Sequence, residues 1–291
     1  MANLKGSDFI KQARSAHFIL NAIGVSRYAN PDSQKTHSIE MEKKREMYLK
    51  DLSKYAQSLD LSGKLNVHMG DYEVIKSFLL NRITNLCKKT SNDYVSGISS
   101  MFTALSEENI TIADEGFEAI EDVRALVKEM PKEEFRTGRY IANAKHVLNR
   151  LYDLNFESGV LAQVQYETGF RIAEAYKLAK SPEKYLLGGA FIIGMIGKGN
   201  HMYGTKGISN DLVLKLSAIE NLPTAHTYSR HLKLVRFDNK AIPHDWRVTY
   251  VKEQFDKRIR QGMCREEALK EVSKLINHYR TAMTEFYLLR A

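Results

Sequence analysis

The sequence has little cysteine and proline and no long apolar run. Its 291 residues include 2 cysteines and 5 prolines. Cys87 and Cys264 lie far apart without CxxC spacing, so we expect two reduced thiols. The stretch FIIGMIG is far shorter than the ~20 residues that span a bilayer, and the N-terminus MANLKGSDF lacks the pattern of a signal peptide. We therefore expect a globular cytoplasmic protein with no membrane partner.

The motifs of several large enzyme classes are also missing. There is no Walker loop, no HExxH, no GxSxG, no GxGxxG after a strand and no Cys/His cluster. Nucleotide, metal and hydrolase-triad chemistry therefore have no anchor in the sequence. We expect neither a cofactor nor a metal.

Positive charge is in surplus. The chain has 43 Lys and Arg against 35 Asp and Glu, a net charge of +8. Such a surplus favours a polyanionic partner, most often nucleic acid, because neutralised phosphates release counterions.

The first half of the chain is predicted to be helical, with helices over 7–23, 36–59, 72–86, 88–105 and 115–130. In the fourth, Thr90 or Ser91 is the expected N-cap. Its apolar spacing predicts that Tyr94, Ile98, Met101 and Leu105 face inward. We expect a helical domain over 1–130, in which 1–35 is a possible extra segment, then a polar linker over 131–138 and a second domain over 139–291.

The second half mixes helices with strands. Helices are expected over 144–154, 159–180, 265–276, from Leu212 onward, and from the HDWR segment to Gly262. Residues 184–200 read as a strand that ends in a GKGN hairpin turn, and 201–209 as a weaker return strand. The predicted fold class is mainly α, with a helical N-terminal domain and an α+β domain that carries a small antiparallel sheet.

Four short segments carry reactive side chains. In ETGFRIAEAYKL, Arg171 opens a helix, where a guanidinium and a helix N-terminus both favour a phosphate, and Glu174 is placed to orient that guanidinium. GKGN raises Lys198 on a turn. HDWR puts His244 and Arg247 on one helix face, beside Trp246, which we expect to pack between helices. The tail INHYRTAMTEFYLLRA holds His278 and Tyr287. Taken alone, each segment is also compatible with a purely structural role, such as a solvated arginine, a lysine in a turn, a core histidine or an apolar helix face.

In this order, TGFR, GKG, HDWR and a His followed nine residues later by Tyr resemble the tyrosine recombinases, or phage-type integrases. The helix KKTSNDYVSGISSMFTAL also looks like part of their core-binding domain, and the resemblance covers roughly 36–291. It implies a helical, SAM-like core-binding domain and a catalytic domain that together form a C-shaped clamp on DNA. The implied activity is site-specific recombination through a 3′-phosphotyrosine, without metal or ATP.

The resemblance also implies a role for each catalytic group. Tyr287 would attack the scissile phosphate, while Arg171 and Arg247 would hold its nonbridging oxygens. Lys198 would protonate the leaving 5′-oxygen, with Lys206 as a rival. His244 would assist proton transfer at the tyrosine, and His278 would hydrogen-bond the phosphate.

The chain departs from the family pattern in several places. Val248 follows HxxR where a second basic residue or a histidine is common. His201, Met202 and Tyr203 replace basic residues of the return strand, and Asn277 precedes His278 where glycine is usual. Because only four residues follow Tyr287, we expect protomer contacts to lie elsewhere than in an exchanged tail.

The implied partner is a double-stranded DNA target site. The implied assembly is a dimer on one site and a tetramer in synapsis, and the implied location is the nucleoid. An accessory factor could set the direction of recombination. Such an enzyme would integrate or excise a mobile element, or resolve replicon multimers.

Two other functions stay open: an architectural or regulatory DNA-binding protein, and a strand transferase like a topoisomerase or telomere resolvase. The basic and polar residues expected to contact DNA are Lys43, Lys44, Lys88, Lys89, Ser91, Arg230 and Lys233.

Overall fold

The computed structural model describes residues 3–23, 35–132, 134, 136–187, 189–198, 200–238, 240–278 and 280–291. By its internal contacts the chain divides into two units, Met1–Glu134 and Phe135–Ala291. The division falls inside the segment expected as a linker. Among the described helices, none is long and apolar enough to cross a membrane.

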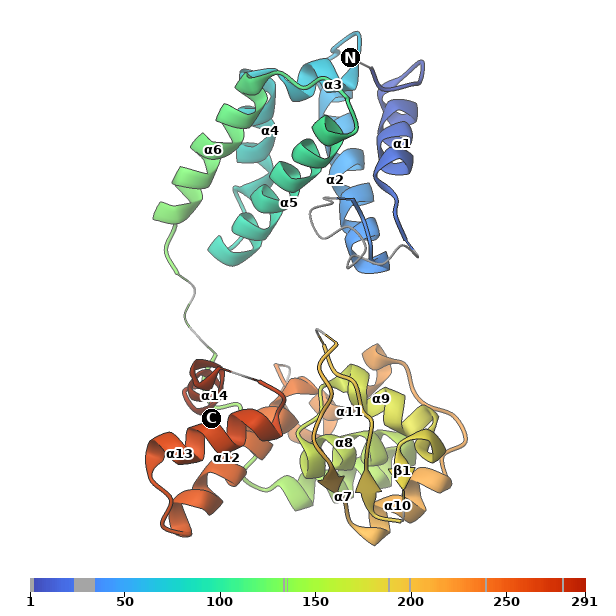
Figure 1. The fold of residues 1–291 in the computed structure, drawn as a ribbon, viewed down its shortest axis with the longest axis vertical. Helices are drawn as coiled ribbons and strands as arrows, with labels where there is room; N and C mark the ends of the chain where they lie inside the picture. The colour runs from blue at the N-terminus through green and yellow to red at the C-terminus, as the bar shows by residue number, and fades with distance from the viewer. Residues whose placement is uncertain are drawn as a thin grey trace. The chain divides into compact units, whose positions relative to one another are not determined.

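The first unit is built from helices (Figure 1). They are α1 (Phe9–Leu20), α2 (Ile39–Ser58), α3 (Leu65–Met69), α4 (Tyr72–Ile83), α5 (Lys88–Glu107) and α6 (Asp114–Glu129). Helix α1 packs along α2, and its apolar residues join the same core as those of the later helices. The possible extra N-terminal segment therefore contributes Leu4, Phe9, Ala13, Ala16 and Leu20 to this core.

Helix α5 shows where local capping signals misled the sequence reading. Tyr94, Ile98, Met101 and Leu105 are buried as predicted. The cap prediction is wrong, because the helix begins at Lys88 with Cys87 as its N-cap. Ser91 instead lies within the helix on its inward face, three residues before Tyr94, and is fully buried. In this structure its side chain is therefore not placed to contact DNA.

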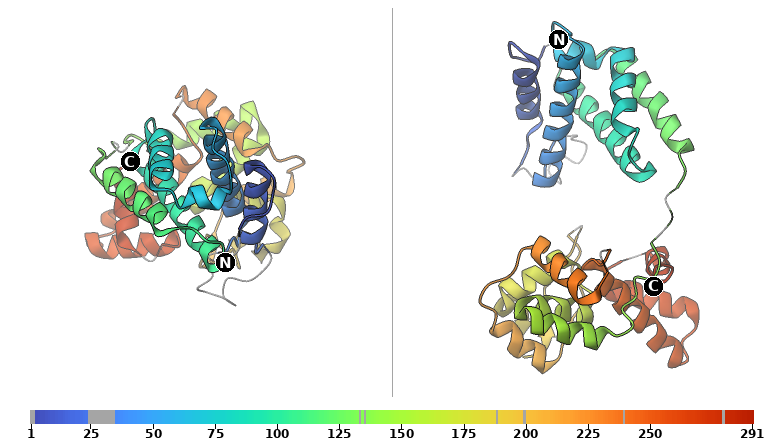
Figure 2. Two further views of the ribbon diagram at one scale, coloured as in Figure 1. Left: turned by 90° about the horizontal axis from the view of Figure 1, so that it is seen from above. Right: turned by 180° about the vertical axis from the view of Figure 1, so that it is seen from behind.

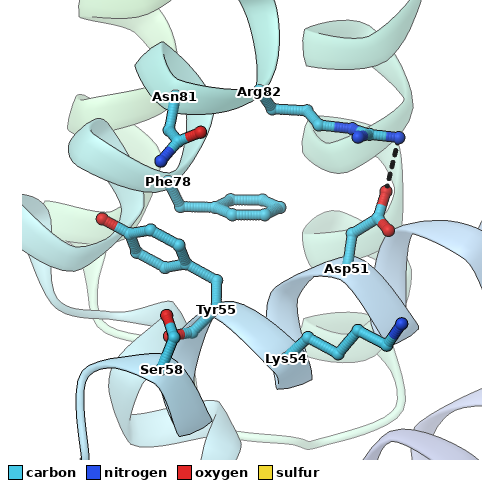
Figure 3. Close-up of a pocket in the computed structure, with 7 residues that line it drawn as sticks. All are labelled: Asp51, Lys54, Tyr55, Ser58, Phe78, Asn81 and Arg82. Atoms are coloured by element: carbon cyan, nitrogen blue, oxygen red, sulfur yellow. Dashed lines mark hydrogen bonds and ion pairs between the residues drawn. The ribbon is translucent and has the colours of Figure 1, made fainter.

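A pocket of about 250 Å³ lies between α2 and α4. Figure 3 shows Tyr55 and Phe78 at its centre, with Arg82 reaching Asp51 at one side. The Arg82 guanidinium is 3.1 Å from the Asp51 carboxylate. The hydroxyl of Tyr94 donates to that carboxylate at 3.1 Å. These bonds join α2, α4 and α5, so the polar residues at the edge of this pocket hold three helices of the first unit together.

The second unit consists mainly of helices (Figures 1 and 2). It also carries a three-stranded antiparallel sheet. Its elements are α7 (Ala144–Leu154), α8 (Phe156–Thr168), α9 (Ile172–Lys180), the 3-10 helix η2 (Pro182–Lys184), β1 (Leu186–Leu187), β2 (Phe191–Ile192), β3 (Lys206–Gly207), α10 (Asn210–Ser217), α11 (Ala225–Arg236), α12 (His244–Arg260), α13 (Arg265–Leu275) and α14 (Thr281–Leu288). The predicted fold class is thus confirmed: mainly helical, with a small antiparallel sheet.

The single strand predicted over 184–200 is wrong. The chain turns near Gly189, whose φ of +95° suits glycine, and the segment becomes two strands, with Leu187 opposite Phe191. Strand β2 then pairs with β3, with Ile192 opposite Lys206. Beyond β2 a hairpin continues, bridged between Ile196 and Met202. This hairpin carries the GKGN turn, of which Gly199 lies outside the described residues.

The apolar core of the second unit has two clusters, which position the HDWR segment and the C-terminal helix. Trp246 is fully buried among the helices of the second unit, as expected from the sequence. A smaller cluster joins α12, α13 and α14 through Val251, Val272, Ile276 and Tyr287. The tail helix is thereby packed against the helix that begins with HDWR.

Candidate active site

Tyr287 lies inward, against the first turn of α12. Its side chain is only 3% exposed. Arg247 Nε donates a hydrogen bond to the Tyr287 hydroxyl at 3.2 Å. The His244 ring lies 5.4 Å from the tyrosine ring, centroid to centroid. His244 and Arg247, three residues apart, thus both face the tyrosine.

Arg247 is held by backbone as well as by side chains. It is fully buried. Its two terminal nitrogens donate at 2.5 Å to the carbonyl oxygens of Gly169 and Ile276. These carbonyls follow α8 and α13, so the guanidinium connects the ends of two helices to the start of a third.

The TGFR segment makes a sharp turn between α8 and α9. Gly169 has φ +68°, and a Cβ there would lie 2.4 Å from the Tyr250 ring. Glycine is therefore required both for the left-handed backbone and for the close approach. The helix predicted over 159–180 is broken at this point, which leaves Arg171 as the N-cap of α9.

Arg171 is fixed by Glu174, as the sequence predicted. Its Nη1 donates to the Glu174 carboxylate at 3.0 Å, and its backbone N–H donates to the same carboxylate at 2.7 Å. Its Nη2 lies 3.1 Å from His278 Nε2. The structure therefore brings Arg171, Arg247, His244, His278 and Tyr287 together.

Both histidines lie in a positively charged environment. Burial, and then the charges of Arg139, Arg247, Arg171 and Arg290, lower the pKa of His244 to about 3. Burial, and then Arg247 and Arg171, lower the pKa of His278 to about 4. Both imidazoles are consequently neutral at pH 7, the form in which a ring nitrogen can accept a proton.

Asp245 positions the start of α12, a role that the sequence reading missed. Its fully buried carboxylate accepts hydrogen bonds from Arg139 at 2.7 Å and from Arg236 at 2.6 Å. It also accepts one from the backbone N–H of Ile242 at 3.2 Å. These bonds anchor the turn that carries His244 and Arg247. Arg139 is remote in sequence and Arg236 lies on a separate helix, so the acidic residue within HDWR was the available signal.

The two candidate lysines occupy different environments. Lys198 is exposed on the hairpin turn. The preceding Gly197 packs against the site: a Cβ there would lie 2.7 Å from the Tyr203 ring and 2.9 Å from Glu174 Oε1. Asn277, next to His278, donates to the His201 carbonyl at 2.8 Å. The base of the hairpin therefore packs against the cluster of Arg171, Arg247, His244, His278 and Tyr287, which we call the arginine site.

Lys206 lies buried on β3, only 7% exposed. Its Nζ donates to the Tyr250 hydroxyl at 3.3 Å and lies 5.0 Å from the centre of that ring. Burial, and then the charge of Arg247, lower the pKa of Lys206 to about 7.

The Lys206 pKa predicts a pH-dependent stability. In the unfolded chain this amine has a pKa near 10.4. Between pH 7 and 9 the unfolded state therefore binds more protons than the folded state, so stability rises with pH. We expect a rise of about 2 kcal/mol in the free energy of unfolding, measured in urea by the fluorescence of the single, buried Trp246.

Replacing Lys206 by Met should flatten that rise. Lys177→Met, at an exposed position of the same unit, is the matched control and should keep it. An equal rise in Lys206→Met and wild type would refute the assignment of this pH dependence to Lys206.

Of the residues expected to contact DNA, some are exposed and others are engaged within the protein. Lys43, Lys44, Lys89 and Arg230 are exposed, and Lys233 is half-buried. The Lys88 ammonium donates to the carbonyls of Lys128 and Met130, where it closes the end of α6. Among the described residues no group of three or more His, Cys, Asp or Glu side chains could hold a metal ion.

No protein-family model and no curated protein matches the sequence. Solved structures match its fold, among them the two that follow. The XerH site-specific recombinase, bound to a palindromic difH substrate in a post-cleavage complex, is 14% identical, with a TM-score of 0.58 over 86% of this chain and 76% of that one. A lambda integrase dimer bound to a COC′ core site is 14% identical, with a TM-score of 0.60 over 94% and 75%. The resemblance seen in the sequence is thus confirmed as a likeness of fold: the chain has the fold of the tyrosine recombinases.

Proposed function

We propose that the chain is a site-specific DNA recombinase that cleaves and rejoins strands through a covalent bond between Tyr287 and a 3′-phosphate. The observation that carries this proposal is the bond from the buried Arg247 to the Tyr287 hydroxyl, with Arg171 and two neutral histidines beside it. A tyrosine beside two arginines suits attack on a phosphodiester, because the arginines stabilise the charge that develops on its oxygens.

Each step has a candidate group. Tyr287 must lose its proton to attack phosphorus, and neutral His244 is an acceptor near its ring. The donor on Arg247 Nε stabilises the phenolate that forms. As the P–O bond to the 5′-oxygen breaks, a lysine supplies a proton to that oxygen. The phosphotyrosine then conserves the bond energy, and attack by a 5′-hydroxyl reverses the steps.

The experiment that tests this function uses a duplex with the cognate site and a nick next to the scissile phosphate, so that the cleaved fragment diffuses away. We expect a covalent protein–DNA adduct on a denaturing gel, with the DNA mapped by mass spectrometry to the peptide that contains Tyr287. Sequence-selective binding without an adduct would instead support the architectural or regulatory reading. Relaxation of supercoiled DNA without strand exchange would support a topoisomerase-like enzyme.

We assign the leaving-group proton to Lys198, on the basis of the hairpin base packed against Tyr203 and Glu174. Lys198→Ala should slow cleavage by about 10²- to 10³-fold. A 5′-thio leaving group needs little protonation, so a duplex with sulfur at this position should restore most of the rate. The measurement is the single-turnover rate of adduct formation on both duplexes.

Lys206→Met is the comparison for this assignment. It should show no selective rescue by sulfur, since we give its amine no part in leaving-group protonation. Rescue of Lys206→Met and not of Lys198→Ala would transfer the role to Lys206.

A further inference from the structure

The hydroxyl of Tyr203 lies where the two arginines meet. Arg171 Nη1 is 3.2 Å from this oxygen, and Arg247 Nη1 is 3.4 Å from it. The hydroxyl donates to Glu174 Oε2 at 2.8 Å. Tyr203 is thus the side chain that both guanidiniums and the carboxylate beside them share.

The donors and acceptors at this oxygen are matched. A phenol has one proton to give and two lone pairs to accept with. Since the proton goes to Glu174, both lone pairs are available to the arginines. Burial, opposed by the charge of Arg247, raises the pKa of Tyr203 to about 12, so the proton stays in place at neutral pH.

The ring is fixed in position from several sides. Tyr203 is only 4% exposed and packs edge-on against Phe170, with the ring centres 4.8 Å apart. Its backbone N–H donates to the Met195 carbonyl at 2.8 Å across the hairpin. Gly197 lies against the ring, where a larger residue would collide with it. A side chain held in this way can set the position of the groups that bond to it.

The other donors of the two arginines point to reactive groups. Arg171 Nη2 faces His278 Nε2, and Arg247 Nε faces the Tyr287 hydroxyl. The rings of His278 and Tyr287 are 6.0 Å apart. With one nitrogen of each guanidinium bonded to the Tyr203 oxygen, these remaining donors converge on one small region.

We propose that Tyr203 is a positioning residue of this site: its hydroxyl sets the spacing of Arg171 and Arg247, so that the donors that face His278 and Tyr287 can meet the two nonbridging oxygens of one phosphate. The proposal rests on the function proposed above. It gives the return strand of the hairpin a role in catalysis without contact to the reacting atoms. Two like charges repel each other, and a shared acceptor between them offsets that repulsion.

Tyr203→Phe removes this acceptor and keeps the ring. We expect adduct formation on the nicked duplex to slow by about 10- to 100-fold, because misplaced donors stabilise the transition state less. Affinity for the intact site should stay within about twofold, since it depends on many phosphate contacts. The matched control is Tyr228→Phe, which deletes another buried hydroxyl of the same unit, bonded to Gln165 instead of an arginine; its rate should stay near that of wild type.

A methylphosphonate at the scissile position separates positioning from a general folding defect. It replaces one nonbridging oxygen by a methyl group and removes the negative charge, so the second arginine has less to stabilise. The penalty of Tyr203→Phe should then shrink to about threefold or less, because it acts through the arginines. An equal penalty on both duplexes, or no penalty on the phosphate, overturns the proposal.

A second measurement does not depend on cleavage. In ¹⁵N spectra, guanidinium nitrogens that are held by hydrogen bonds rotate slowly and give resolved signals. We expect Arg171 to show resolved Nη signals in wild type and in Tyr228→Phe, and averaged signals in Tyr203→Phe. Arg247 should stay resolved in all three, because the carbonyls of Gly169 and Ile276 also hold it. Unchanged Arg171 signals in Tyr203→Phe refute the positioning role. A wild type that forms no adduct, yet shows this loss in Tyr203→Phe, instead refutes the proposed function and leaves the geometry supported.

Discussion

Tyr287→Phe is expected to abolish the covalent adduct, with a loss of at least ~10⁴-fold in single-turnover cleavage, because no other group replaces a nucleophile that forms the bond. Binding to the intact site should be unchanged or slightly tighter. The phenylalanine ring keeps the packing of a side chain that is only 3% exposed, and the deleted hydroxyl accepts a bond from Arg247. The measurement pairs adduct yield with a gel-shift titration of the same preparation.

The control for this variant is Tyr176→Phe. Its hydroxyl donates to the Pro223 carbonyl at 2.6 Å, outside the arginine site, so cleavage should persist. An adduct that survives in Tyr287→Phe would move the nucleophile to another residue. Loss of the adduct in both variants would point to a folding defect in the second unit.

The two arginines are expected to respond differently to replacement by lysine. Arg247→Lys should slow cleavage by about 10³-fold, since a lysine supplies neither the planar fork nor a donor at the Nε position. It should also destabilise the second unit by about 2–5 kcal/mol, because the buried carbonyls of Gly169 and Ile276 lose their donors. Cleavage rates and urea unfolding measured on one preparation test both parts.

Arg171→Lys should slow cleavage by a similar factor and cost less than ~1 kcal/mol in stability. Its side chain is 22% exposed, so water can replace the lost bonds. If both variants lost the same stability, the contrast between the fully buried Arg247 and the partly exposed Arg171 would be wrong. If Arg247→Lys cleaved at the wild-type rate, Arg247 would have no part in the chemistry.

Much of the site was predictable because its members lie in short segments with distinctive neighbours. The glycine of TGFR is needed for a left-handed turn beside Tyr250, and the three-residue spacing of HDWR puts His244 and Arg247 on one face. The replacement of glycine by Asn277 also has a physical account. This residue has φ +55°, and asparagine is among the few other residues that enter that region readily.

The remaining features could not be predicted, most of them because they depend on contacts between separate segments. Asp245 could not be assigned a role without knowing that Arg139 and Arg236 meet it. Tyr203 was read only as a departure from a basic pattern, and its contacts with Arg171 and Arg247 come from three separate segments. The cap of α5 was misplaced because Thr90 and Ser91 are good capping residues, whereas the helix begins after Cys87.

The two neutral histidines have a thermodynamic consequence for the proposed binding of DNA. Part of the reason that their pKa values are low is the surrounding positive charge of the arginines. A phosphate bound in the site brings negative charge and opposes that effect, so protons bind the imidazoles more readily when DNA is present. By linkage the effect is reciprocal: if bound phosphate raises the proton affinity of the imidazoles by some factor, their protonation raises the affinity for phosphate by the same factor. Under the proposed function, protons and DNA are thus coupled ligands of one site.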